Sequence, residues 1–342
     1  MMIRPRCAMI LLWLSFATTV AAAERLPTMW PPLLQPGDTI MFVSPAGPPE
    51  RELCERAKQR IEALGYKVTW REDMFDVDGY LAGSDQRRAA ELMQAFNDPE
   101  IDAILCTRGG YGCMRMLDGL DFEAIRAHPK LVVGYSDITA LHAALNRRAG
   151  LVSFHGPGPS SGTGGEKPPT DFTQQALRNA LVADATPAEG YLIEVPESVA
   201  KVGHFGSGKA RGRLVGGNLS LVAALEGTPY AVDCEDAILV LEDVGEAPYR
   251  IDRTLQQLKL TGKLPQLRGA VLGQFTEDYK REDKLTEDDR FNTNGVLRQY
   301  FEGLGVPVLY NFPLGHVAEN CTLPLGAEAE IDAEAGTIRI IR

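Results

Sequence analysis

The sequence predicts a two-domain α/β protein, in which a parallel-sheet domain is followed by a smaller, mixed α+β domain. Over the first half of the chain, short apolar runs alternate with helical patterns, which is typical of a parallel sheet with helices on both faces. A stretch rich in glycine and proline at 155–170 interrupts this alternation, and a second group of strand and helix patterns follows it. A chain of 342 residues is also longer than one hydrophobic core usually organises.

Residues 1–23 have the pattern of a secretory signal peptide. Arg4 and Arg6 precede an apolar run at 9–20, and three alanines at 21–23 form a small-residue cleavage site. The run is shorter than the roughly 20 residues that a membrane-spanning helix needs, so a retained anchor is the less favoured alternative. We therefore expect a periplasmic protein that begins near Glu24 and has no stable membrane insertion after processing.

Residues 24–160 are expected to form the N-terminal domain. Its strands are compact apolar runs bounded by turn residues, and its helices carry apolar residues at helical spacing. Ser84 is in position to cap the second helix. The expected strands are 39–44, 66–70, 101–106 and 131–135, and the expected helices are 53–64, 84–96 and 137–148.

Residues 161–205 are expected to be an irregular linker with one short helix, and residues 206–342 to form the C-terminal domain. The second domain shows both strand and helix patterns without a repeat. The expected strands are 211–215, 237–241, 270–274, 308–310 and 337–341, and the expected helices are 219–226, 250–260 and 294–304.

Charge and cysteine content exclude several classes of function. A net charge of −11 argues against nucleic-acid binding, which rewards basic surfaces. Six cysteines include Cys7 in the signal segment, and the odd number that remains cannot all pair within the chain. No cysteine or histidine cluster has the spacing of a zinc site. We expect no disulfide, no metal and no cofactor.

The first candidate for chemistry is the segment VGYSD at 133–137, in which Ser136 follows an apolar strand and precedes a helix. Open α/β sheets bind ligands at the carboxyl ends of their strands, where Ser136 is expected to lie. The amide of Asp137, at a helix N-terminus, can help to bind an oxyanion. The segment lacks the second glycine of the G-x-S-x-G motif. At this point, helix capping by Ser136 or Asp137 remains an alternative.

A second candidate is the glycine-rich loop TRGGYG at 107–112, which also directly follows a strand. Glycines let backbone amides approach a ligand or a developing negative charge. The loop matches neither the dinucleotide fingerprint nor the P-loop, and no dinucleotide fingerprint follows the first strand. A nucleotide-dependent oxidoreductase is therefore disfavoured, and a tight turn remains an alternative explanation of the loop.

The other candidates are histidines and a group of acids, and each alone is weak evidence, because surface acids are common and a single histidine is more often structural than catalytic. His316 follows a strand and a tight loop, and His155 is its competitor. His128 and His142 fall on helical patterns, so we expect them to be structural. The acids at the end of a β-rich run are Glu242, Asp243 and Glu246.

Five ordered segments resemble the LD-carboxypeptidase family, the S66 serine peptidases, which also contains the microcin C immunity peptidases. The resemblance extends from Gly37 to Gly326. It implies a flavodoxin-like N-terminal domain, a smaller β-rich C-terminal domain, an active site in the cleft between them, and a homodimer. The segments are RGGYG at 108–112, GYSD at 134–137, GGNL at 216–219, LED at 241–243 with PYR at 248–250, and GH at 315–316.

The resemblance also implies catalytic roles for individual residues. The serine of the GYSD segment is the nucleophile, here Ser136, and the histidine of the GH segment is the general base, here His316. The glutamate of the LED segment orients that base, which selects Glu242 rather than Asp243 or Glu246. An imidazole is needed because a neutral serine hydroxyl is a poor nucleophile until its proton is taken.

Members of the family release the terminal D-alanine of murein tetrapeptides by cutting the amide between an L-centre and a D-residue. We expect the amide of Asp137, with that of Gly109 or Gly110, to bind the oxyanion. Arg108 could bind the carboxylate of the D-alanine, and a structural salt bridge is an equal alternative for it. Tyr111 in the same loop is the other expected substrate contact.

Two further readings stay open. A microcin-immunity-like peptidase would cleave a peptidyl-nucleotide, and it would need an aromatic platform, whereas the segment after Pro157 is poor in aromatic residues. An exported, non-enzymatic peptide-binding protein could use the same cleft, but candidates for all three catalytic groups argue against it. Typical family members work in the cytoplasm on recycled murein peptides, so the expected signal peptide points to murein fragments or stem peptides in the periplasm.

Overall fold

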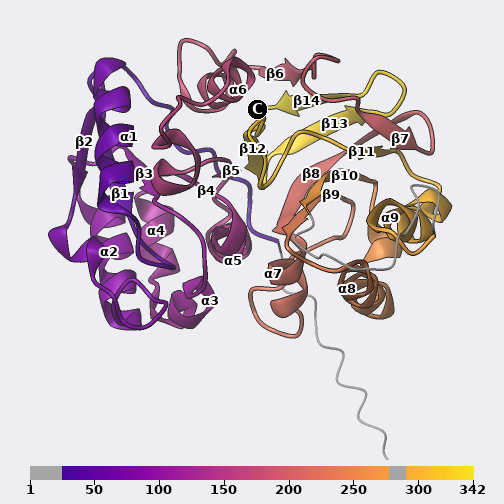
Figure 1. Ribbon diagram of the computed structural model, residues 1–342, viewed down its shortest axis with the longest axis horizontal. Coiled ribbons are helices and arrows are strands. Elements are labelled where there is room, and N and C mark those ends of the chain that lie inside the picture. Colours follow the sequence, from indigo (N-terminus) through magenta and orange to yellow (C-terminus); the bar gives the residue numbers. More distant parts are fainter. Residues whose placement is uncertain (1–24, 277–289) are drawn as a thin grey trace, which may run out of the picture.

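The computed structural model describes residues 25–276 and 290–342, so the expected signal peptide lies outside the described residues. In this part of the chain, a six-stranded and an eight-stranded sheet lie side by side, with strand β12 between them (Figure 1). No helix of the described residues has the length and apolarity that crossing a bilayer requires. The two-domain α/β fold class is confirmed.

The first sheet has the order β12-β5-β4-β3-β1-β2. All pairs among β1 to β5 are parallel, and the order 2-1-3-4-5 is that of flavodoxin-like folds. Four of these strands were expected, while β5 is too short to produce a clear pattern. The strands are β1 (Thr39–Val43), β2 (Lys67–Trp70), β3 (Ala103–Cys106), β4 (Leu131–Gly134) and β5 (Ser153–His155).

Helices cover both faces of this sheet because side chains alternate along each strand. On β1, Met41 and Val43 share a core with residues of α2 and α5, while Ile40 and Phe42 share another with residues of α1 and α6. Ser84 caps α2 by accepting a hydrogen bond from the Arg87 amide, as expected. The helices are α1 (Arg51–Ala63), α2 (Asp85–Asn97), α3 (Cys113–Met116), α4 (Phe122–Ala127), α5 (Thr139–Ala144) and α6 (Asp171–Leu181).

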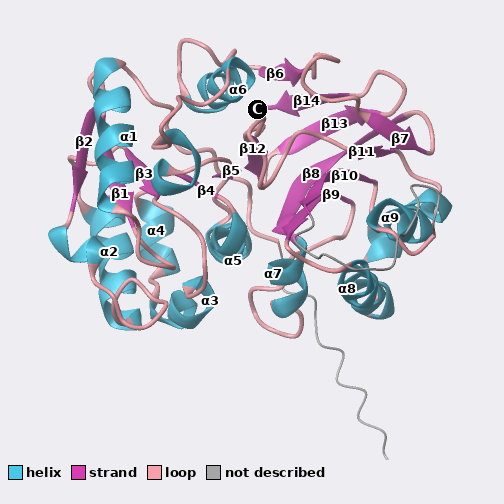
Figure 2. Cartoon of the chain, in the orientation of Figure 1, coloured by secondary structure: helices cyan, strands magenta, loops and turns pink. Residues whose placement is uncertain are grey.

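The second sheet has the order β6-β14-β13-β8-β9-β10-β11-β7, with parallel pairing from β8 to β11 and antiparallel pairing elsewhere. Its helices α7 (Leu219–Ala224), α8 (Pro248–Leu260) and α9 (Thr293–Phe301) lie below it in Figure 2. The strands are β6 (Gly190–Ile193), β7 (Gly203–Phe205), β8 (Lys209–Asn218), β9 (Ala237–Val244), β10 (Gly269–Thr276), β11 (Val308–Tyr310), β13 (Glu328–Asp332) and β14 (Thr337–Ile341).

Two segments tie the sheets together more closely than the sequence indicated. The stretch 161–205, expected as an irregular linker with one short helix, contains that helix as α6 and also the edge strands β6 and β7, which pair with β14 and β11. The late strand β12 (Leu323–Leu325) pairs with β5 and so belongs to the first sheet. The strands β6 and β12 have too few residues for a hydrophobic period, and their partners are distant in sequence.

Candidate active site

Three loops meet at the carboxyl edge of the parallel sheet, after β1, β3 and β4. The amide of Gly47 in the first loop donates to the carbonyl of Gly109 in the second at 3.2 Å. Arg88 of α2 is fully buried and donates to the carbonyls of Pro45 and Gly112, each at 2.7 Å. This buried guanidinium therefore fixes the loop after β1 and the loop after β3 relative to each other.

Ser136 has a strained backbone conformation, with φ of 64° in the left-handed region that favours glycine. Such strain in a non-glycine residue often marks a functional position. Two residues earlier, a Cβ on Gly134 would lie 2.9 Å from the side chain of Ile138, so a larger residue would clash. Ile138 occupies the position of the second glycine in G-x-S-x-G, and its side chain packs against Gly134, which occupies the position of the first glycine. The left-handed conformation of Ser136 makes this turn sharp, as in a nucleophile elbow.

The glycine loop approaches Ser136 at Gly109. A Cβ on Gly109 would lie 2.7 Å from the Ser136 Cβ and 3.0 Å from the Asp137 nitrogen, so only glycine fits there. In the described part of the chain, the amide of Gly110 donates no hydrogen bond. The expected oxyanion donors therefore lie in adjoining segments of backbone.

The Asp137 side chain anchors the glycine loop to the turn that carries Ser136. Its carboxylate accepts a hydrogen bond from the Cys113 amide at 2.8 Å, and burial raises the pKa of the carboxyl group. The sequence left open that Asp137 caps the helix that follows it. Its carboxylate instead contacts the backbone at the end of the glycine loop.

The eight-stranded sheet supplies a buried carboxylate–histidine pair. Glu242 on β9 is fully buried, and its Oε2 lies 2.8 Å from Nδ1 of His316. Burial raises the pKa of Glu242, and the hydrogen bond with His316 opposes that rise. Because Nδ1 is engaged with the carboxylate, Nε2 is the ring nitrogen available for proton transfer.

The other two acids of this segment have different partners. Asp243 accepts hydrogen bonds from the Asn218 side chain at 2.9 Å and from the Ser220 amide at 3.0 Å, which fixes the start of α7. Glu246 forms an ion pair with Arg250 at 3.5 Å. Of the three acids, Glu242 is the one that contacts His316.

Sequence reasoning missed the residues that shape the His316 loop. Asn320 is buried and accepts a hydrogen bond from the Gly315 amide at 3.1 Å. Thr173 of α6 accepts from the Asn320 amide at 2.9 Å and donates to the Ala318 carbonyl at 3.0 Å. These contacts join residues far apart in sequence, and no local motif announces them.

The turn that carries Ser136 approaches His316 through Tyr135, whose ring centroid lies 4.8 Å from that of His316. Ser136 and His316 form no hydrogen bond in the described part of the chain; such bonds often tighten only when substrate is bound. The competitor His155 is fully buried beside Tyr135, 6.0 Å between ring centroids, and neither of its ring nitrogens has a partner in this part of the chain.

The two expected substrate contacts, Arg108 and Tyr111, have side chains exposed to solvent. Among residues 25–276 and 290–342, Arg108 forms no side-chain hydrogen bond or ion pair, so the structural salt bridge is absent. The ring of Tyr111 is 45% exposed and packs edge-on against Tyr80, with centroids 5.6 Å apart. No group of His, Cys, Asp and Glu suited to a metal ion occurs in these two ranges.

Comparisons with known proteins identify the family to which the chain is similar. Family models described as the LD-carboxypeptidase N-terminal and C-terminal domains match residues 40–156 and 211–331. A probable murein peptide carboxypeptidase of Bacillus subtilis (strain 168) is 37% identical over 90% of this chain and 92% of the relative. A murein tetrapeptide carboxypeptidase of Pseudomonas aeruginosa is 33% identical over 86% and 92%. The solved apo structure of the wild-type microcin C7 self-immunity protein MccF superposes with a TM-score of 0.82 at 27% identity, over 92% and 98%.

Proposed function

Because the chain belongs to the LD-carboxypeptidase family of serine peptidases, we propose that Ser136, His316 and Glu242 form its catalytic triad. In this proposal, residues 24–160 supply the nucleophile and residues 206–342 supply the base and its carboxylate. The observation that carries the proposal is the buried Glu242–His316 pair, which lies against the ring of the residue before the strained serine.

The proposed reaction proceeds through an acyl-enzyme. Ser136 Oγ attacks the scissile carbonyl carbon while His316 Nε2 takes its proton, and Glu242 stabilises the imidazolium. The amides of Asp137 and Gly110 bind the oxyanion. When the C–N bond breaks, His316 returns the proton to the leaving amine. Water then attacks the ester carbonyl while His316 takes its proton. The bond between the acyl carbon and Ser136 Oγ breaks, His316 returns the proton to Oγ, and the acid product leaves.

We propose that the substrate is a murein tetrapeptide and the leaving group its terminal D-alanine. Two of the relatives are named for murein peptides, and the exposed guanidinium of Arg108 is available for the carboxylate of the D-residue. Arginine binds carboxylates through parallel hydrogen bonds, which would also fix the orientation of the peptide. Tyr111 is the second proposed contact.

A second candidate is hydrolysis of a peptidyl-nucleotide, and one observation favours it. The Tyr80–Tyr111 pair presents exposed rings, 66% and 45% exposed, at the rim of the glycine loop, where a base could stack. This aromatic pair was not apparent from the sequence. It makes a peptidyl-adenylate analogue the necessary comparison substrate.

We also propose that the protein is exported and acts on murein peptides in the periplasm as a homodimer. Export is proposed from the pattern of residues 1–23, and the dimer from the family resemblance. Cell fractionation with N-terminal sequencing should find a periplasmic chain that begins near Glu24. Light scattering on the purified chain should give twice the mass of one chain.

The proposed activity is tested by mass spectrometry of the mature chain incubated separately with murein tetrapeptide, pentapeptide and a peptidyl-adenylate analogue. We expect D-alanine from the tetrapeptide, little from the pentapeptide, and about 10⁶-fold less from the tetrapeptide with Ser136→Ala. Equal release from the pentapeptide would refute the bond specificity, and faster cleavage of the analogue would favour the second candidate. Activity of Ser136→Ala within tenfold of the unmodified enzyme would remove Ser136 from the mechanism.

A further inference from the structure

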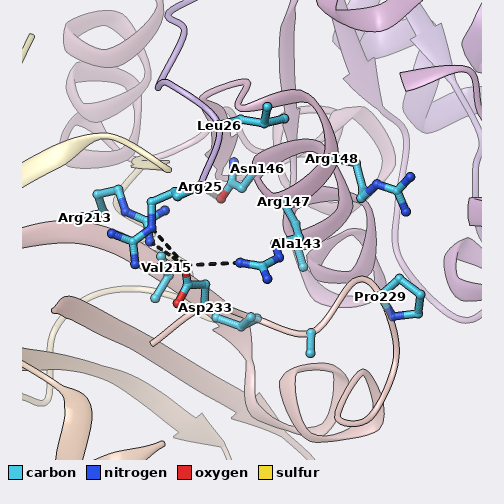
Figure 3. A pocket seen from close by; sticks show the side chains of 13 residues that line it. Arg25, Leu26, Ala143, Asn146, Arg147, Arg148, Arg213, Val215, Pro229 and Asp233 are labelled. Carbon is cyan, nitrogen blue, oxygen red and sulfur yellow. Dashed lines mark hydrogen bonds and ion pairs between the residues drawn. The ribbon is translucent and has the colours of Figure 1, made fainter. Parts of the chain in front are cut away.

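A hollow of about 380 Å³ lies between the two sheets, and none of the proposed catalytic residues lines it (Figure 3). Its walls come from the end of α5 with the helical turn 145–149 that follows it, from β8, and from the loop after α7. Arg147 belongs to the first of these, Arg213 to the second and Asp233 to the third, while Arg25 reaches in from the start of the described chain. The site therefore joins segments from both family-model regions.

Three guanidinium groups converge on a single carboxylate oxygen in this hollow. Oδ2 of Asp233 lies 2.9 Å from Arg25, 3.3 Å from Arg147 and 3.2 Å from Arg213. Glu235 lies 3.8 Å from Arg25, but its side chain is 72% exposed and solvent screens that pair. In a chain of net charge −11, the hollow thus concentrates positive charge that Asp233 does not balance.

The guanidinium groups keep most of their hydrogen-bonding capacity. Each has five N–H donors in a planar fork, whereas Arg147 and Arg213 each give one side-chain hydrogen bond, to Asp233, in the described part of the chain. Arg213 is the least exposed of the three, with 13% of its side chain accessible. Burial and the charge of Arg25 lower the pKa of Arg213, and the charges of Asp233 and Glu328 oppose that shift without cancelling it.

The neighbouring polar side chains have other partners. Arg148 points away from Asp233 in Figure 3 and lies over the rings of Phe122 and Tyr230, at 5.6 and 5.9 Å. The amide of Asn146 is used by backbone carbonyls. The rest of the lining is largely apolar. The donors left in the hollow are therefore guanidinium groups alone, which match planar or tetrahedral oxyanions.

We propose that this hollow is a binding site for a small oxyanion, a phosphate or a carboxylate, held by Arg147 and Arg213. The anion would balance the excess positive charge. It would also bridge the two halves of the molecule, because Arg147 follows α5 of the first half and Arg213 lies on β8 of the eight-stranded sheet. Its binding would therefore stabilise the arrangement of the two units without contacting Ser136, Glu242 or His316.

The test is a thermal melt of the mature chain titrated with sodium phosphate, and separately with succinate, with sodium chloride added to keep ionic strength constant. We expect a saturable rise in Tm of about 3 to 6 °C with at least one of the two anions. Comparing the two titrations distinguishes a phosphate source from a carboxylate source. The measurement does not depend on peptidase activity, so its result is independent of whether the proposed function is correct.

Matched variants locate the response. Arg147→Gln and Arg213→Gln should abolish the anion-dependent rise, while Arg148→Gln on the same segment and Arg211→Gln on the same strand should retain it. Arg108→Gln should also retain it, which excludes binding of the anion at the guanidinium proposed for the substrate carboxylate. The inference is overturned if neither anion gives a saturable rise, or if Arg147→Gln responds as the unmodified chain does.

Discussion

The two halves of the proposed catalytic site are held in place by different means. On the side of the six-stranded sheet, Ser136 itself takes the left-handed backbone conformation, and close packing against Gly109 fixes the turn. On the side of the eight-stranded sheet, the left-handed residue is Gly315, where that conformation costs little, and a buried hydrogen bond holds Glu242 to His316. The nucleophile half therefore depends on shape, and the base half depends on charge.

The largest expected effect comes from removing the reacting group of either half, because the triad acts as a unit. His316→Ala should lower kcat/KM for D-alanine release by about 10⁶-fold, as Ser136→Ala does. His155→Ala should lower it far less, since His155 has no carboxylate partner in the described part of the chain. Steady-state kinetics of the three variants measures this, and a reversed ranking of the histidines would identify His155 as the base.

The next effect tests the charge of the base half. Glu242→Gln keeps the shape of the side chain but removes the charge that stabilises the imidazolium, so kcat should fall by about 10⁴-fold. Glu246→Gln should leave kcat nearly unchanged, because that acid pairs with Arg250. Asp243→Asn should mainly lower Tm, because it loosens the start of α7. Similar losses of kcat in all three variants would show general damage to this segment.

A smaller effect tests the shape of the nucleophile half. Gly109→Ala would place a Cβ 2.7 Å from that of Ser136, so the loop must move and the oxyanion donors with it. Loss of one such donor typically costs about 10² to 10³-fold in kcat. Gly303→Ala is the control, because its Cβ would meet nothing within 4 Å. An unchanged kcat in Gly109→Ala would place the oxyanion donors elsewhere.

The smallest effect concerns the support behind the nucleophile strand. His142 is fully buried between the Gly134 carbonyl and the Ser153 hydroxyl, and burial lowers its pKa to about 4. The folded state therefore favours neutral His142, while the unfolded chain takes up the proton near the ordinary pKa of about 6.5. Stability should fall as the pH drops from about 6.5 to about 4, by on the order of 3 kcal/mol in the free energy of unfolding.

Urea unfolding at pH 7 and pH 4.5 measures this loss. His142→Gln should reduce the difference between the two pH values, whereas His128→Gln, at the exposed end of α4, should keep it. Burial also lowers the pKa of His155, so some dependence on pH should survive in His142→Gln. The same pH dependence in both variants would show that other groups destabilise the protein in acid.

The parts that the sequence predicted are those with local patterns. The strand ending at Gly134 and the Ser84 cap follow from apolar periods and turn residues close together in the chain, while the flavodoxin-like arrangement was implied by the family resemblance. The strands β5, β6 and β12 have only three or four residues, and their position depends on partners far away in sequence. Local patterns cannot encode such pairings.

The same distinction holds within the candidate site. The segments around Ser136, Glu242 and His316 were recognisable, but the alternatives for Arg108 could be separated only once its surroundings were known. Arg88, Thr173 and Asn320 escaped notice because each acts through a contact with a distant backbone group. Identifying them required the arrangement of both sheets.

Strand β12 has a consequence for the order in which the molecule forms. The edge of the first sheet at β5 is closed by Leu323–Leu325, which come later in the sequence than β6 to β11 of the second sheet. During synthesis or transport, the amide and carbonyl groups at that edge stay unpaired until most strands of the second sheet have also emerged. Closing so long a loop is slow, so we expect the two units to complete folding together rather than one after the other.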